Sequence, residues 1–190
     1  MRATFLDENR QHQFLQKGYV KLPLISSDEA DELLQFYKSL PCDIEGHAFH
    51  STLRSADFEY RKIIDEKIQG ILRPKIDSIL DRHKLLFANY LVKEANVNSE
   101  VGVHQDWRFV DESKYRALVI WCTLTDTFAD NGPLFILEGS HKLNTPVSFR
   151  FAPNLNEKLK KLVKDKSAVI YAKKGEAILY DSAIFHFSPP

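Results

Sequence analysis

The sequence lacks a long apolar run, an excess of charge of either sign, and more than two cysteines. No run approaches the roughly 20 apolar residues of a membrane-spanning helix, and the N-terminal segment has no apolar signal core. Lys+Arg and Asp+Glu each number 26, so the formal net charge is zero, which disfavours electrostatic capture of nucleic acid or an anionic membrane. Cys42 and Cys122 cannot form a disulfide framework, so we expect a cytoplasmic protein.

The remaining composition is that of an ordinary folded domain. Of the 190 residues, 44% are hydrophobic, which is enough for one core, and we find neither internal repeats nor low-complexity segments. We therefore expect a single domain over residues 1–190. Neutral charge without a basic patch favours a small-molecule substrate, and no pattern indicates an oligomeric state.

Residues 1–82 are predicted to be mainly helical. The segment Ser26–Glu29 is typical of a helix start, because serine and aspartate side chains cap the first backbone N–H groups. Apolar residues follow at spacings of three and four until Pro41. Residues 42–57 have no period and are predicted to be a loop. A third helical pattern covers residues 58–80, and we expect Pro74 to kink it or divide it in two.

The pattern changes near residue 85 to short runs rich in β-branched and aromatic residues, separated by Gly, Asn and Asp. These runs are LLFANYLVKEA, YRALVIWCTLTD, GPLFILEG, AVIYAK and GEAILYD. One surface helix is predicted at residues 154–166, with Leu155, Leu159, Leu162 and Val163 as its buried stripe. The order of elements favours an α+β fold in which the helices of residues 1–82 support a sheet built from residues 83–190.

The first candidate for chemistry is the segment Val103–Trp107. In an extended chain, residues i and i+2 project from the same face, so His104 and Asp106 lie together and Gln105 points away. An imidazole beside a carboxylate provides two adjacent ligands for a divalent metal. With a second histidine they would form the facial triad of non-haem Fe(II) oxygenases, which leaves positions open for a co-substrate and O2.

An H-x-D triplet alone is weak evidence, because such triplets are often ordinary surface pairs, so a third ligand from a distant strand is needed. The candidates are His141 and His186. His186 follows a predicted strand that ends at Asp181, and it lies 82 residues after His104 (186 − 104), which is enough chain to go round a barrel and return. We expect His141 to be structural, and His47 and His50 to belong to a loop.

Three ordered motifs, HQDW (104–107), IWCTLTDTFADNGPLFILEGSHK (120–142) and GEAILYDSAIFHFS (175–188), resemble the phytanoyl-CoA dioxygenase family of Fe(II)/2-oxoglutarate oxygenases. The middle motif contains the family's N-G-P-L and G-S-H signatures, and the last contains its G…D…H-x-S pattern. The resemblance is clear from about residue 85 onwards and vague before that.

The resemblance implies a double-stranded β-helix, a relative of the jelly roll and the cupins. It also implies hydroxylation of an unactivated C–H bond in a small metabolite, with 2-oxoglutarate and O2 consumed and succinate and CO2 released. Related halogenases lack the carboxylate ligand, so Asp106 favours hydroxylation, although desaturation stays open. By position, the resemblance assigns iron to His104, Asp106 and His186, and 2-oxoglutarate to Trp121, Ser188, Asn89 and Lys93.

The sequence departs from the family at its end. Family members place an arginine roughly ten residues beyond the distal histidine, where it pairs with the far carboxylate of 2-oxoglutarate. Here Pro190 is the last residue, four after His186, so we expect the sequence to be truncated relative to the natural protein. Arg116 and Arg150 are possible substitutes, but their spacing recommends neither.

Two other function classes stay open. One is a non-catalytic β-helix protein that binds a metal or a small ligand, which would be favoured if the arginine is truly missing. The other is a cupin-type metalloenzyme that does not use 2-oxoglutarate. Cupin sites usually contain more histidines, and only His104 occurs within the metal segment here.

Overall fold

The computed structural model describes residues 2–41, 48–95, 97–106, 109–112, 114–143 and 155–190. The helices are α1 (Glu8–Lys17), α2 (Ser27–Ser39), α3 (Phe58–Asp77) and α4 (Glu157–Lys166). The strands are β1 (Tyr19–Pro23), β2 (Phe49–Ser51), β3 (Leu91–Lys93), β4 (Val101–His104), β5 (Leu118–Cys122), β6 (Leu134–Ile136), β7 (Ala168–Ile170), β8 (Glu176–Asp181) and β9 (His186–Ser188). Helices combined with antiparallel strands confirm the predicted α+β class.

The helices begin at the side-chain caps that the sequence contains. In α2, the Ser26 side chain accepts from the backbone of Glu29, and the Glu29 side chain accepts from the backbone of Ser26, which is the predicted start. The expected division of the third helix does not occur, because α3 continues through Pro74. Pro74 lies in the last turn of α3, where its missing N–H removes only one bond of the helix. Within the described ranges, no helix is both long and apolar enough to cross a membrane.

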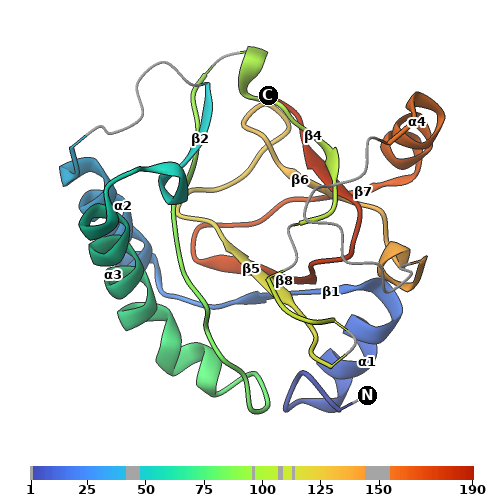
Figure 1. The fold of residues 1–190 in the computed structure, drawn as a ribbon, viewed down its shortest axis with the longest axis horizontal. Helices are drawn as coiled ribbons and strands as arrows, with labels where there is room; N and C mark the ends of the chain where they lie inside the picture. The colour runs from blue at the N-terminus through green and yellow to red at the C-terminus, as the bar shows by residue number, and fades with distance from the viewer. Residues whose placement is uncertain (1, 42–47, 96, 107–108, 113, 144–154) are drawn as a thin grey trace.

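Two antiparallel sheets form the centre of the molecule (Figure 1). The first has the strand order β1-β8-β5, and the second has the order β4-β9-β6-β7. From β4 onwards the chain crosses repeatedly between them. β5 and β8 belong to the first sheet, while β4, β9 and the consecutive strands β6 and β7 belong to the second. Strands β2 and β3 form a separate pair.

The first sheet is the middle layer of the fold, because the side chains on both faces of its central strand β8 are buried. Ala177 and Leu179 belong to the core shared with the helices, whereas Ile178 and Tyr180 belong to the core shared with the second sheet. Figure 1 shows α2 and α3 side by side at one flank of the sheets. Burying each large aliphatic side chain of these cores contributes about 1.5–3 kcal/mol.

Residues 1–82 contribute strands as well as the predicted helices. β1 is an edge strand of the first sheet and lies opposite β8, with Tyr19 facing Tyr180. The short YVKLP run follows Gly18, the left-handed cap that ends α1. Five residues between two stronger helical patterns give little periodicity, which is why the sequence does not predict this strand. The organisation as one domain, with a mainly helical part up to residue 82 and a sheet part after it, stays a prediction.

Two predicted elements are shorter or less buried than expected. The run LLFANYLVKEA forms a sheet ladder only at Leu91–Lys93, and residues 83–90 lie outside any helix or strand. The predicted surface helix is present as α4, and Val163 on it is fully buried. Leu162, however, is 51% exposed, so the buried stripe of α4 is narrower than the sequence suggests.

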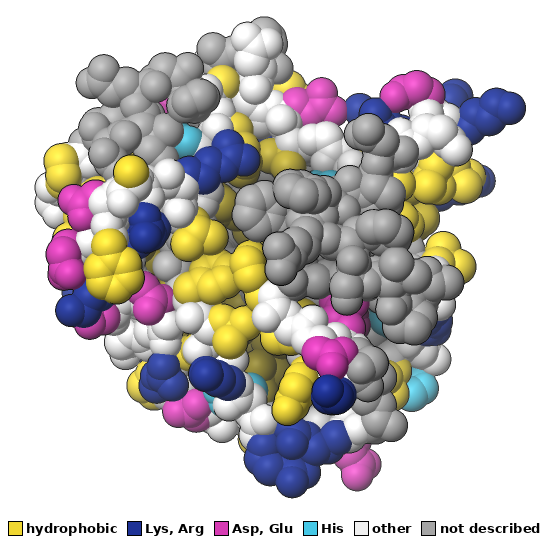
Figure 2. Space-filling view, in the orientation of Figure 1, with side chains coloured by type: hydrophobic (Ala, Val, Ile, Leu, Met, Phe, Trp, Pro, Cys, Tyr) yellow, Lys and Arg dark blue, Asp and Glu magenta, His cyan; other side chains and the backbone are white. Residues whose placement is uncertain are grey.

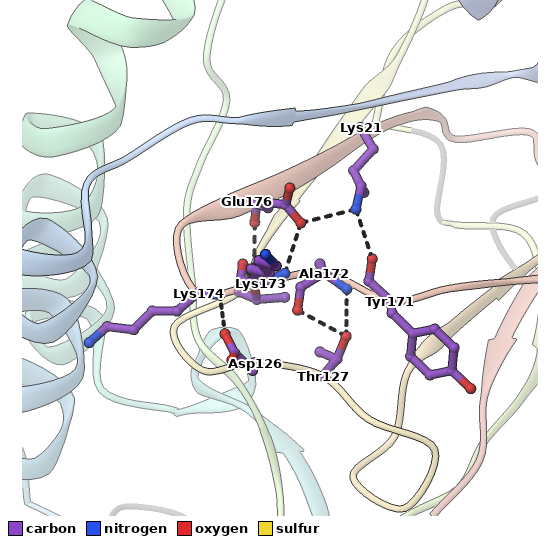
Figure 3. A network of polar contacts seen from close by, with 9 residues as sticks. Lys21, Asp126, Thr127, Tyr171, Ala172, Lys173, Lys174 and Glu176 are labelled. Carbon is purple, nitrogen blue, oxygen red and sulfur yellow. Dashed lines mark hydrogen bonds and ion pairs between the residues drawn. The ribbon is translucent and has the colours of Figure 1, made fainter.

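A polar network fixes the turn between β7 and β8 (Figure 3). The ammonium group of Lys21 on β1 donates to Glu176 Oε2 at 3.0 Å and to the carbonyl of Tyr171 at 3.1 Å. The same Glu176 oxygen accepts from the backbone N–H of Lys173, and Lys174 N–H donates to Asp126 Oδ1 at 2.7 Å. The turn is thereby tied to β1 and to the loop that follows β5.

The glycine in this turn provides a test of the described packing. Gly175 has φ +82°, and a Cβ atom there would overlap the carbonyl oxygen of Ile25. We expect Gly175→Ala to lower the free energy of unfolding by about 2 kcal/mol or more, because both strain and overlap oppose it. Gly70→Ala is the matched control, since Gly70 lies in α3 with open space around it; it should stabilise by up to about 1 kcal/mol. Chemical denaturation of both variants measures these changes. Equal unfolding free energies for Gly175→Ala and Gly70→Ala would contradict the close packing of Gly175 against Ile25.

Candidate metal centre

The pairing of β4 with β9 brings two distant histidines together. His104 at the end of β4 lies directly opposite His186 at the start of β9, and Val101 lies opposite Ser188. A shift of register occurs between these two positions. The imidazole ring centroids are 4.1 Å apart, and the ring planes cross at 51°. His141, the other candidate for a third ligand, contacts the Phe14 ring with the ring centroids 6.4 Å apart.

Asp106 completes a cluster of three possible ligands with these histidines. His104, Asp106 and His186 each offer one ligand atom, and the three atoms lie within 4.8 Å of one another. His104 Nε2 is 3.6 Å from Asp106 Oδ1, and His186 Nε2 is 3.6 Å from Asp106 Oδ2. Adjacent ligands of an octahedral ion with bonds of about 2.1 Å lie about 3 Å apart, so the spacing suits a small divalent cation.

Both imidazoles are oriented by a backbone carbonyl. His104 Nδ1 lies 2.8 Å from the carbonyl oxygen of Gly102, and His186 Nδ1 lies 3.0 Å from that of Ile184. A carbonyl can only accept, so each Nδ1 carries the proton and donates it. Each Nε2 faces Asp106 and can offer its lone pair to a metal when that nitrogen carries no proton, as metal-binding histidines require.

The charges of the cluster also suit a cation. Burial lowers the pKa of His186 to about 4, so this ring is neutral near pH 7. Burial alone would raise the pKa of Asp106 and lower that of His104, but their mutual hydrogen bond and charge attraction outweigh burial. The pKa of Asp106 is therefore lowered and that of His104 is raised. Asp106 Oδ2 is buried and has no hydrogen-bond partner among the described residues. A metal ion between the three side chains would satisfy this oxygen.

The turn between β8 and β9 helps to position both Asp106 and His186. The backbone N–H of Asp106 donates to the carbonyl of Ser182 at 3.0 Å, and the Gln105 side-chain amide donates to the carbonyl of Ala183. The N–H of Phe185, next to His186, donates to Ser140 Oγ at 2.9 Å. One turn therefore positions Asp106 directly and His186 through its neighbour.

Asp181 shapes this turn from within. Its Oδ1 accepts from the N–H of Ala183 at 3.0 Å, and its Oδ2 lies 3.8 Å from Arg116 Nε. The Arg116 guanidinium also lies over the ring of Phe14, 5.2 Å from its centroid. Arg116 is thus engaged with Asp181, while Arg150 lies outside the described residues. The contact between Arg116 and Asp181 was not predicted, because Asp181 ends β8 whereas Arg116 lies before β5, far earlier in the sequence.

The residues predicted to contact 2-oxoglutarate fall into two places. Lys93 Nζ lies 2.7 Å from Ser188 Oγ, and Ser188 donates to the carbonyl of Gly132 at 2.8 Å. Trp121 packs in the core between the sheets, on the same face as Tyr180, whose ring is 4.9 Å from that of His186. Asn89 instead donates to Ser51 Oγ at 2.8 Å. Four residues of extended chain, about 13 Å, separate it from Lys93.

Comparison with known proteins identifies the family. Residues 14–190 match the family model described as Phytanoyl-CoA dioxygenase (PhyH). The chain belongs to this family. It is also 29% identical, over 156 residues, to the phytanoyl-CoA dioxygenase domain-containing protein 1 homolog of Dictyostelium discoideum. That match covers 76% of this chain and 52% of the relative, so the PhyH chain spans about half the length of the curated relative it matches.

Solved structures share the fold of this PhyH chain at low sequence identity. EvdO2 from Micromonospora carbonacea var. aurantiaca, complexed with 2-oxoglutarate, superposes with a TM-score of 0.59 at 18% identity, over 100% of this chain and 86% of that one. HygX from Streptomyces hygroscopicus, with nickel and 2-oxoglutarate bound, gives a TM-score of 0.63 at 16% identity, over 97% and 81%. These similarities show a common fold.

The contacts of Asp181 predict a measurable effect on metal binding. We expect Asp181→Ala to weaken Ni(II) or Co(II) affinity by about tenfold or more, because the turn that orients Asp106 and His186 loses an internal hydrogen bond. The free energy of unfolding should fall by about 1–3 kcal/mol. Asp181→Asn keeps an acceptor for Ala183 N–H, so it should recover most of the metal affinity.

Metal titration and chemical denaturation check this expectation together. Asp165→Ala is the control, since Asp165 forms an exposed ion pair with Lys161 on α4. It should change the unfolding free energy by less than about 0.5 kcal/mol and leave metal affinity unchanged. Wild-type metal affinity in Asp181→Ala would show that the turn does not position the ligands.

Proposed function

We propose that this PhyH chain is an Fe(II)- and 2-oxoglutarate-dependent oxygenase in which His104, Asp106 and His186 bind the iron. The observation that carries the proposal is the cluster of three ligand atoms within 4.8 Å, contributed by the ends of β4 and β9. Two imidazoles and one carboxylate on one side of an ion leave its other positions for 2-oxoglutarate and O2. The EvdO2 and HygX structures contain 2-oxoglutarate, which supports this choice of co-substrate.

The proposed reaction is hydroxylation of an unactivated C–H bond in a small molecule, with succinate and CO2 released. Iron with 2-oxoglutarate and O2 would supply the oxidising chemistry. The protein's own residues prepare the site. His186 is 3% exposed and neutral, and Tyr180 is 4% exposed beside it, so this side of the centre excludes water. The carboxylate of Asp106 would occupy one ligand position of the metal, which favours hydroxylation over halogenation.

Lys93 and Ser188 are the proposed contacts for a carboxylate of 2-oxoglutarate. Lys93 Nζ donates a hydrogen bond to Ser188 Oγ, and Ser188 is two residues from His186 on β9. Burial lowers the pKa of Lys93 to about 8, against the opposing charge of Glu100, so the ammonium group is still mostly protonated near pH 7. Trp121 is proposed to pack against the co-substrate from the middle sheet. The assignment of Asn89 to 2-oxoglutarate stays a prediction.

The strand arrangement supports a finer description of the fold. From β4 to β9 the chain crosses repeatedly between two antiparallel sheets that share a core, and only β6 and β7 are consecutive in the same sheet. Repeated crossing between two sheets is typical of a double-sheet architecture such as the jelly roll. We therefore propose that residues 83–190 form a double-stranded β-helix, with the metal cluster at the end where β4 and β9 meet.

Anaerobic spectroscopy tests the proposed centre. Addition of Fe(II) and then 2-oxoglutarate to the metal-free wild type should produce the weak visible charge-transfer band of an iron–oxoglutarate chelate. His104→Ala should give no band, because one imidazole ligand is lost. Iron binding without the band would contradict the use of 2-oxoglutarate and favour a metalloprotein of another class.

A lysine variant tests the proposed co-substrate contact. We expect Lys93→Met to raise the 2-oxoglutarate concentration needed for half of the band at least tenfold, because a partly buried positive charge is lost. Fe(II) affinity should stay within twofold. Lys161→Met removes an exposed lysine of α4 and should change neither value. An unchanged 2-oxoglutarate requirement in Lys93→Met would exclude Lys93 from the co-substrate site.

A further inference from the structure

The extended segment before β4 has two different faces. Ala88, Tyr90 and Val92 pack against the core shared with the helices. Successive side chains of an extended chain alternate in direction, so the residues between them face away from this core. These outward-facing residues are Phe87, Asn89, Leu91 and Lys93. Phe87 is 38% exposed and Leu91 is 53% exposed, so this outer face presents two apolar side chains to solvent beside the polar Asn89 and Lys93.

Strand β2 extends the outer face. Phe49 lies opposite Lys93, and Ser51 lies opposite Leu91, in the antiparallel pair of β2 and β3. Residues directly opposite one another in such a pair project from the same side. In Figure 2, hydrophobic side chains gather in the middle of the visible surface, between the helical flank and the residues drawn in grey.

Both ends of the outer face are joined to the segments that hold the candidate ligands. At one end, Lys93 contacts Ser188, two residues after His186. At the other end, the ring of Phe87 meets the ring of Phe109 edge-on, with their centroids 4.9 Å apart and their planes at 78°. Phe109 follows Asp106 by three residues. At each end, the outer face therefore contacts a residue that lies two or three positions after a candidate ligand in the sequence.

A cavity of about 140 Å³ lies at the Phe87 end of the outer face. Its lining residues are Thr52, Leu53, Arg61, Asp65, Phe87, Ala88 and Asn89. A cavity of about 150 Å³ lined by apolar side chains is large enough to bind benzene, so this volume corresponds to one ring or one branched alkyl group.

The two charged side chains that line the cavity already form contacts with other groups of the protein. Arg61 donates to the carbonyl of Ser55, and its guanidinium lies over the ring of Phe58 at 5.8 Å. Asp65 Oδ1 accepts from Ala88 N–H at 2.6 Å and from Gln69 Nε2 at 2.7 Å. An incoming charged group would have to displace these contacts, so an uncharged apolar group is the better occupant.

We infer that this cavity is a substrate subsite which binds an uncharged, apolar, ring-sized group, while the rest of the substrate lies along the outer face toward the metal centre. The inference rests on the proposed function, because it assigns the cavity to the substrate of that oxygenase. It adds the chemical class of the group that the substrate must carry.

Benzyl alcohol is a suitable probe for the cavity, and saturation-transfer NMR on the full chain detects its binding. We expect the ring protons to show transfer in the wild type, and myo-inositol, a polar ring of similar size, to show none. Leu53→Trp fills the cavity and should weaken benzyl alcohol binding at least tenfold. Tyr171→Ala removes an aromatic side chain 46% exposed on the β7–β8 turn, and it should bind like the wild type.

The probe also tests whether the cavity faces the metal. Mn(II) bound at the candidate centre should broaden the ring signals of bound benzyl alcohol in the wild type and not in His104→Ala. Absent benzyl alcohol binding, equal binding of myo-inositol, full binding by Leu53→Trp, or no broadening by bound Mn(II) would each overturn the inference. Failure of the wild type to bind Mn(II), seen separately in water relaxation, would instead overturn the proposed metal centre and, with it, the assignment of the cavity to that substrate.

Discussion

The pairing of β4 with β9 is the constraint on which the candidate site depends. It sets His104 opposite His186 and leaves Asp106, just beyond the strand, close to both imidazoles. A slip of one residue would turn every side chain of one strand to the opposite face and separate the two rings. The register is held by β6 on the other side of β9, where Phe135 stacks on Phe187 at 4.7 Å, and by the turn from Asp181 to Phe185. The site is therefore a property of the second sheet as a whole.

Much of the fold follows from local patterns in the sequence. The capping box at Ser26 and the apolar spacing after it predict α2, and the β-branched runs after residue 85 predict most strands of the sheets. β1 and β2 were missed because each is short, and tertiary pairing with β8 and β3 decides their conformation. The ladder predicted from residue 85 forms only at Leu91–Lys93, since the residues before it use alternate side chains for core packing without a neighbouring strand.

The candidate site, like the fold, could be predicted only in part from the sequence. The i, i+2 spacing of His104 and Asp106 predicts that the two share a face, and the distal motif points to His186 as the third member of the cluster that the structure brings together. The surrounding contacts could not be predicted in this way. Arg116 approaches Asp181 from the segment before β5. The two groups that orient the imidazoles are the backbone carbonyls of Gly102 and Ile184, which no side-chain pattern reveals. Asn89 was grouped with Lys93 by its strand position, yet the extended chain carries it to the cavity end of the outer face.

The pairing of the first strand with one of the last has a consequence for the order of events during synthesis. Lys21 on β1 and its ion-pair partner Glu176 on β8 are 155 residues apart in sequence. At translation rates of roughly 5–20 residues per second, β1 waits about ten seconds or more for β8 to leave the ribosome. The helices can form in that interval, because their contacts are local, but the middle sheet cannot close. His186 emerges later still, so the three candidate ligands can come together only after β9 has been made.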